Sequence, residues 1–190
     1  MCEHNELDGA DVAKFDPEAW EMLIGCSFKE DNYSQFTLMY EEILRGKCRF
    51  CNIDRVFHTV LFEKWGWIAW KIPTPASNAE RQQSLELALL FLPKRHIRHL
   101  GELNWREWIG FILVIKWIYK TFTFQGGGFI ARVGDLRWTV GTVRHLHFQF
   151  FVPNREGEVI AYLQKKPEMR TENEARAKRF LERYNAGERA

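Results

Sequence analysis

The alternation of apolar and polar side chains is most regular between residues 144 and 152. With a period of two, one side carries the nitrogen-bearing side chains of His145, His147 and Gln149. The other side is apolar and consists of Leu146, Phe148, Phe150 and Val152. This pattern is typical of a β-strand buried on one face, with neighbouring imidazoles on that face roughly 6.6 Å apart. Such a strand gives up core packing, so it indicates a metal site, a substrate site or, alternatively, a satisfied polar network.

Helices are expected at both ends of the chain and further strands between them. Apolar residues at helical spacing follow Asp16-Pro17 and again follow Ser34, predicting two short helices. A capping box at Asn104 and Glu107 precedes one long amphipathic helix. A closing helix is expected from about Thr171. Additional strands are expected at 66–70, 85–91, 129–133 and 159–163.

Charge and apolar run length exclude two classes of protein. The chain has 190 residues, enough for one domain with a real core, and its net charge of +2 is too balanced for a protein that coats nucleic acid. No polymeric nucleic acid partner is expected. The most apolar run, 108–119, is too short to span a bilayer. The four cysteines are Cys2, Cys26, Cys48 and Cys51, and the N-terminus shows no leader pattern. We therefore expect a cytoplasmic chain whose cysteines are reduced.

Cys48 and Cys51 have the spacing of half a tetrahedral zinc site. A redox role would require this pair at a helix start within a βαβ unit, and the pattern predicts no such unit. Two more ligands would have to come from elsewhere in the chain. The glycines at 126–128 match no phosphate-loop pattern and indicate a turn.

Three motifs in order resemble those of the histidine triad (HIT) superfamily: Cys48-x-x-Cys51-x-Ile53, Pro93-Lys94-Arg95-His96, and Gly141-Thr-Val-Arg-His-Leu-His-Phe-Gln149. The resemblance covers roughly residues 46–165. It implies an α+β fold with an antiparallel sheet of about five strands and a long helix, a nucleotide substrate, and commonly a homodimer. Residues 1–45 would then be an N-terminal helical extension, and 166–190 a C-terminal helix.

The resemblance also implies roles for individual residues. In zinc-bearing members the ligands correspond to Cys48, Cys51, His96 and His145, a closed set that indicates structural Zn²⁺. His99 is the alternative to His96.

In the same comparison, His147 matches the nucleophile that attacks the α-phosphorus of a nucleotide and carries the nucleotidyl group. Thr142, after Gly141, matches a phosphate-binding Ser or Thr. Arg144 could neutralise phosphate, although a solvated surface charge is the simpler interpretation. Asp135 stands where many members have asparagine and could bind a sugar hydroxyl.

Two departures from the family pattern affect the expected activity. The third triad position is Gln149, whose amide can donate to a phosphoryl oxygen but cannot exchange a proton with a leaving group. His-x-His-x-Gln marks the nucleotidyltransferase branch, whose intermediate passes to a phosphorylated acceptor. The acidic residue that commonly holds the ribose is missing, because residues 70–73 read Trp-Lys-Ile-Pro.

Three hypotheses follow. The first is an enzyme acting through nucleotidyl-His147, with transfer to a phosphorylated acceptor slightly favoured over hydrolysis because of Gln149. The second is a hydrolase of dinucleoside polyphosphates or nucleoside phosphoramidates. The third is a zinc-stabilised nucleotide-binding or interaction module without catalysis.

Overall fold

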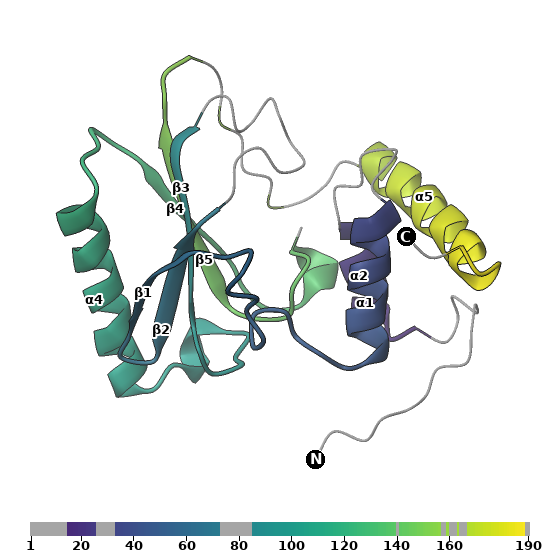
Figure 1. Ribbon diagram of the computed structural model, residues 1–190, viewed down its shortest axis with the longest axis horizontal. Coiled ribbons are helices and arrows are strands. Elements are labelled where there is room, and N and C mark those ends of the chain that lie inside the picture. The colour runs from purple at the N-terminus through teal and green to yellow at the C-terminus, as the bar shows by residue number, and fades with distance from the viewer. Residues whose placement is uncertain are drawn as a thin grey trace. The chain divides into compact units, whose positions relative to one another are not determined.

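The computed structural model describes residues 15–25, 33–72, 85–139, 141–156, 159, 163 and 167–188 (Figure 1). The chain divides into two compact units. The first comprises residues 1–49, 135–144 and 162–190, and the second comprises 50–134 and 145–161. Within the described ranges, no helix is both long enough and apolar enough to cross a membrane.

The second unit is built on one five-stranded antiparallel sheet, which confirms the expected α+β fold class. Its strands are β1 (Val60–Lys64), β2 (Trp67–Lys71), β3 (Leu85–Pro93), β4 (Gly128–Arg132) and β5 (His147–Pro153). Their order across the sheet is β1-β2-β3-β5-β4. Strand β5 therefore lies between β3 and the edge strand β4, with antiparallel neighbours on both sides.

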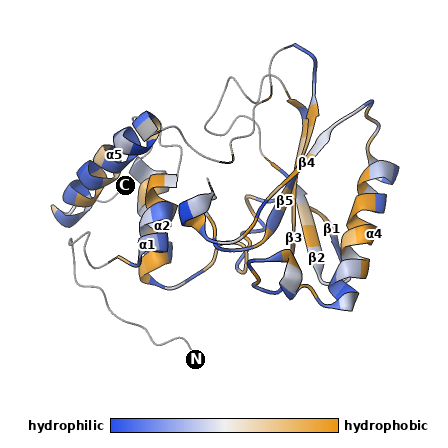
Figure 2. Ribbon diagram, turned by 180° about the vertical axis from the view of Figure 1, so that it is seen from behind, coloured by the Kyte–Doolittle hydropathy of each residue, from blue (hydrophilic) through white to orange (hydrophobic). Residues whose placement is uncertain are grey.

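Each face of the sheet has its own apolar cluster, as the period-two pattern requires. On one face, residues such as Phe91 and its cross-strand partner Phe148 pack with Val114 and Ile118 of helix α4 (Trp105–Thr121). The other face carries a smaller cluster around Trp70 and Leu92. Figure 2 shows the apolar residues concentrated on the central strands and along α4.

The start of α4 is set by the capping box expected from the sequence, which the structure confirms. The Glu107 N–H donates to Asn104 Oδ1 (3.0 Å), and the Asn104 N–H donates to the Glu107 carboxylate (2.9 Å). These bonds satisfy backbone donors that have no partner inside the helix. A short 3₁₀ helix, η2 (Leu100–Glu102), precedes the cap.

The first unit contains α1 (Pro17–Gly25), α2 (Tyr33–Leu44), η3 (Leu136–Trp138) and α5 (Pro167–Asn185). These elements enclose an aromatic-rich core that includes Phe36 and Phe180. The predicted cap of α1 is present, because the Glu18 N–H donates to Asp16 Oδ1 (3.1 Å).

The expected start of the closing helix near Thr171 is wrong, since α5 begins at Pro167. Proline suits a first helical position. The next turns also pack on α1, where the buried Asn173 amide donates to the Ile24 carbonyl (3.0 Å). That contact is between helices far apart in sequence, so the local pattern gives no sign of it.

Two strand predictions also change. Strand β5 begins at His147, so His145 precedes the strand instead of belonging to it. The Leu146 N–H donates to the Ile97 carbonyl (2.6 Å) outside the sheet ladder, which turns the chain before β5. The sequence pattern missed β1, whose hairpin turn to β2 has positive φ at both Trp65 (55°) and Gly66 (76°). Tryptophan rarely adopts this conformation. The predicted strand 159–163 falls largely outside the described residues.

Gly110 allows α4 to approach the β1–β2 hairpin closely. A Cβ at this position would lie 2.3 Å from the Trp65 carbonyl oxygen and 2.4 Å from Trp67 Cδ1. We therefore expect Gly110→Ala to lower the free energy of unfolding by about 1–3 kcal/mol through overpacking, although alanine favours helix by about 1 kcal/mol. Urea unfolding will measure the change. Gly101→Ala, where the added Cβ meets open space, is the control and should be nearly neutral; equal effects would contradict the close-approach explanation.

Candidate metal centre and histidine site

Four of the sequence-predicted residues come together around one point. Cys48 and Cys51 lie on the loop after α2, His96 follows β3, and His145 precedes β5. Their ligand atoms all lie within 4.8 Å of one another. Cys51 Sγ is 3.2 Å from His96 Nδ1 and 3.6 Å from His145 Nδ1. Two sulfur and two imidazole donors form a set typical of a closed tetrahedral zinc site.

The orientation of His145 suits a metal ligand. Its Nε2–H donates to the Pro93 carbonyl (2.8 Å), which leaves the unprotonated Nδ1 directed toward Cys51. A bond of this kind fixes the tautomer of a ligating imidazole. Burial lowers the pKa of His145 to about 4, with the neighbouring imidazoles acting in the same direction and the Pro93 carbonyl opposing them. The ring is therefore neutral near neutral pH, as metal binding requires.

His96 and His99 differ in their surroundings. Partial desolvation of the imidazole, followed by the nearby Arg98 charge, lowers the pKa of His96, so this ring also favours the neutral form although the residue is exposed overall. His99 lies outside the Cys/His cluster. Its ring lies against Gly134, with Cε1 3.2 Å from the position that a Cβ would occupy there. Cys2 and Cys26 fall outside the described residues.

His147 begins β5 and is only 7% exposed. Its Nδ1–H donates to the His145 carbonyl (2.7 Å), so Nε2 carries the lone pair. Burial lowers the pKa of His147, and the Arg132 charge contributes in the same direction. The Phe50 ring meets the imidazole edge-on, with centroids 5.0 Å apart. This is a neutral, oriented imidazole of the kind that a nucleophile or general base requires.

Gln149 lies two residues further along β5, on the same face as His147. Arg132, the cross-strand partner of His147 on β4, places Nη1 3.4 Å from Gln149 Oε1. The amide oxygen thus accepts from Arg132, which leaves the amide nitrogen as the donor of this side chain.

The other predicted substrate residues belong to the first unit. Asp135 caps η3 and pairs with Arg137, accepting from its backbone N–H (2.8 Å) and its guanidinium. Arg144 forms ion pairs with Asp16 and Glu18. The remaining two, Gly141 and Thr142, are respectively buried and half-buried.

Sequence reasoning gave too little weight to two neighbours of His147. Phe50 stands between the two cysteines, and its closeness to that motif was the available signal. Arg132 belongs to none of the three motifs, yet the β4–β5 register sets it opposite His147. Register depends on pairing between distant segments, so no local pattern could identify it.

A cavity of about 320 Å³ beside Cys51 is lined in part by Phe50, Arg55, Glu63 and Lys94. His147 does not line it. Glu63 pairs with both cations, at 2.9 Å from Arg55 and 2.5 Å from Lys94. This single carboxylate balances one of the two positive charges in the lining.

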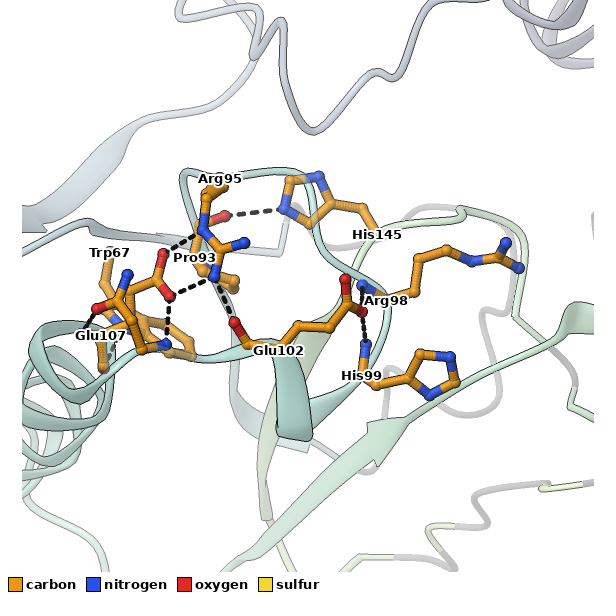
Figure 3. Close-up of polar contacts among 9 residues, drawn as sticks. Trp67, Pro93, Arg95, Arg98, His99, Glu102, Glu107 and His145 are labelled. Carbon is orange, nitrogen blue, oxygen red and sulfur yellow. Dashed lines mark hydrogen bonds and ion pairs between the residues drawn. The ribbon is translucent and has the colours of Figure 1, made fainter.

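The segment between β3 and α4 is held by a polar network (Figure 3). Arg95 forms a two-pronged ion pair with Glu107 at the start of α4, with distances of 2.9 and 2.7 Å. The Arg95 hydrogen bonds lower the pKa of Glu107, and burial of the carboxyl partly opposes this shift.

Comparisons with known proteins return histidine triad structures. Similar chains include a Zn-bound histidine triad family protein from Mycobacterium smegmatis, with 20% identity over 74% of this chain and 97% of that chain at a TM-score of 0.43. A HIT family hydrolase from Clostridium thermocellum is 26% identical over 60% of this chain and 96% of that chain, at a TM-score of 0.45. No family model and no curated protein sequence matches. With TM-scores below 0.5, a functional assignment depends on the residues of this chain.

The pKa of Glu107 predicts how stability depends on pH. Folding favours the charged carboxylate, so this contribution is present above about pH 4.5 and is lost as the pH falls below that value. We expect Glu107→Gln to cost about 1.5–3 kcal/mol near neutral pH and progressively less on acidification. Urea unfolding of chelator-treated protein between about pH 6 and pH 3 will test this. Glu86→Gln, which removes an exposed carboxylate, is the control; a pH-independent cost at Glu107 would contradict the assignment.

Proposed function

We propose that this chain is a histidine triad enzyme that acts at the α-phosphate of a nucleotide through a covalent nucleotidyl-His147 intermediate. The observation that carries the proposal is the 2.7 Å hydrogen bond from His147 Nδ1 to the His145 carbonyl. It leaves the Nε2 lone pair on a neutral imidazole, which is the form that attacks phosphorus.

The first step would form a bond from Nε2 to the α-phosphorus as the bond from phosphorus to the leaving group breaks, with the electron pair departing on that group. The Gln149 amide would donate to a phosphoryl oxygen, and the Arg132 guanidinium would neutralise charge in the transition state. In the second step an acceptor oxygen attacks phosphorus, the phosphorus–nitrogen bond breaks, and neutral His147 is regenerated.

Gln149 favours transfer over hydrolysis in this proposal. An amide cannot supply a proton to a leaving group or remove one from water near neutral pH. A phosphorylated leaving group or acceptor carries its own negative charge and needs no such proton. A nucleotidyltransferase acting on a phosphorylated acceptor is therefore the preferred form, and a hydrolase is the alternative.

We further propose a structural zinc ion held by Cys48, Cys51, His96 and His145. The donor set fits the ion, since both imidazoles favour the neutral form and the ligand atoms cluster within 4.8 Å. Four protein ligands leave no open position, so the metal would supply rigidity. Because His145 is a ligand and its carbonyl orients His147, the metal would also stabilise the orientation of the nucleophile.

A homodimer in a reducing cytoplasm remains our expectation. The outer surface of α4 supports pairing, because it exposes large apolar side chains: Trp105, Trp108, Ile109 and Ile112. Clusters of exposed apolar residues are typical of interfaces.

The zinc proposal predicts one zinc ion per chain in protein purified without chelators, measured by elemental analysis. Removal of one ligand by Cys48→Ser or His96→Asn should weaken zinc binding by more than about 100-fold, because changes to outer-sphere partners alone cost 10–100-fold. The melting temperature should fall as well, since metal binding is coupled to folding. His99→Asn is the matched control and should retain zinc. Zinc-free wild-type protein would refute the assignment.

The catalytic proposal predicts a covalent adduct. After brief incubation with dinucleoside polyphosphates, nucleotide sugars or adenosine phosphoramidate, intact-protein mass spectrometry should show an acid-labile gain of one nucleoside monophosphate. His147→Ala should abolish the adduct because it removes the attacking nitrogen.

The acceptor separates the remaining alternatives. Turnover that requires a phosphorylated acceptor supports transfer, and turnover by water alone supports hydrolysis. If nucleotides bind equally to wild type and His147→Ala without any adduct, the chain is a binding module and the catalytic proposal fails.

A further inference from the structure

The loop from Pro93 to Glu102 contributes two groups to the Cys/His cluster. It supplies His96 as a candidate ligand, and its Pro93 carbonyl accepts the proton of His145 Nε2 (2.8 Å). Residues 94–96 are exposed, so packing alone does not fix them. Backbone bonds hold both sides of this stretch: the Lys94 N–H donates to the Gly66 carbonyl (2.7 Å), and the Ile97 carbonyl accepts from the Leu146 N–H (2.6 Å).

Arg95 anchors the middle of this loop. Its guanidinium donates to both carboxylate oxygens of Glu107, at 2.9 and 2.7 Å, and to the Glu102 carbonyl (2.5 Å). Figure 3 shows these bonds converging on Arg95, with the Pro93 carbonyl turned toward His145. A planar guanidinium bonded at three points has little freedom to move.

Glu107 is itself fixed, so it can act as an anchor. Its carboxylate also accepts from the Asn104 N–H (2.9 Å) in the helix cap. Its backbone carbonyl accepts from Trp67 Nε1–H (2.7 Å), and Trp67 is fully buried in the main core. The carboxylate therefore belongs to the rigid junction of α4 and β2.

Glu102 closes the other end of the loop. Its carboxylate accepts from the backbone N–H groups of Arg98 and His99, both at 2.8 Å. The residues on both sides of His96 are therefore held: Arg95 by Glu107 at the start of α4, and Arg98 by Glu102 just before that helix.

We propose that the Arg95–Glu107 ion pair is a positioning element of the metal centre, which holds His96 and the Pro93 carbonyl in the ligating arrangement. The inference rests on the proposed zinc site. If the loop is already ordered before the ion binds, binding does not have to order it, and affinity is higher. Loss of the pair should therefore weaken zinc binding although every ligand remains.

The test compares Glu107→Gln and Arg95→Met with a matched control elsewhere in the chain. Arg170 and Glu21 form a similar two-pronged pair, at 2.9 and 2.5 Å. Side-chain exposures are also alike: 48% and 9% for Arg95 and Glu107, against 44% and 11% for Arg170 and Glu21. Glu21→Gln therefore removes a comparable ion pair with no link to the loop.

Zinc affinity will be measured near neutral pH by chelator competition on the full chain, after circular dichroism shows each metal-free variant to be folded. We expect roughly tenfold weaker binding for Glu107→Gln and Arg95→Met, at the lower end of outer-sphere effects. Glu21→Gln should stay within about twofold of wild type, since this pair belongs to the first unit and the Pro93–Glu102 loop to the second. Cobalt-substituted variants should keep the tetrahedral thiolate spectrum, because the ligands are unchanged.

The outcomes separate the two proposals. Wild-type protein that binds no zinc refutes the metal site itself. Wild-type binding with unchanged affinity in Glu107→Gln and Arg95→Met overturns the positioning role, as does an equal loss in Glu21→Gln. If these variants do not fold without metal, Arg95→Lys keeps the charge but not the fork, and unchanged zinc affinity in that variant overturns the proposal.

Discussion

The hydrogen bond from His145 to the Pro93 carbonyl connects the parts of this site. It sets the tautomer of His145, so Nδ1 faces the sulfur of Cys51. The carbonyl of the same residue accepts from His147 and thereby sets the tautomer of the second imidazole. One residue thus orients both the candidate metal cluster and the candidate nucleophile.

Burial adds to this geometry. Both imidazoles are nearly inaccessible to solvent, and burial is the main cause of the lowered pKa of each. A metal ligand and a nucleophile need the same thing from an imidazole, namely a free lone pair near neutral pH. The apolar surroundings of β5 meet both requirements. Neither ring leaves a buried N–H donor unsatisfied, because each donates to a backbone carbonyl.

The contact between α4 and the β1–β2 hairpin helps to fix the loop that carries His96. Gly110 permits the close approach, and Trp67 donates to the backbone of Glu107. Glu107 in turn pairs with Arg95, one residue before His96. Within the second unit, a short series of polar contacts therefore joins the main core to the loop that carries His96.

Local sequence rules were sufficient for much of the fold. Period-two alternation located most of β5, and the capping box at Asn104 placed the start of α4, because both depend on residues a few positions apart. The Cys48–Cys51 spacing indicated half of a metal site, and the family resemblance named the two histidines that lie beside it. The antiparallel sheet was an implication of the same resemblance.

Tertiary structure decided the rest. It set the start of β5 at His147, because Leu146 bonds to Ile97 and the ring of His145 turns toward Pro93. It set Arg132 opposite His147 and joined Arg95 to Glu107. It also formed a hairpin turn at Trp65, whose positive φ no local preference favours. Strand register and ion pairs between separate segments are fixed by packing over the whole unit, and for that reason the sequence by itself does not contain a readable signal for them.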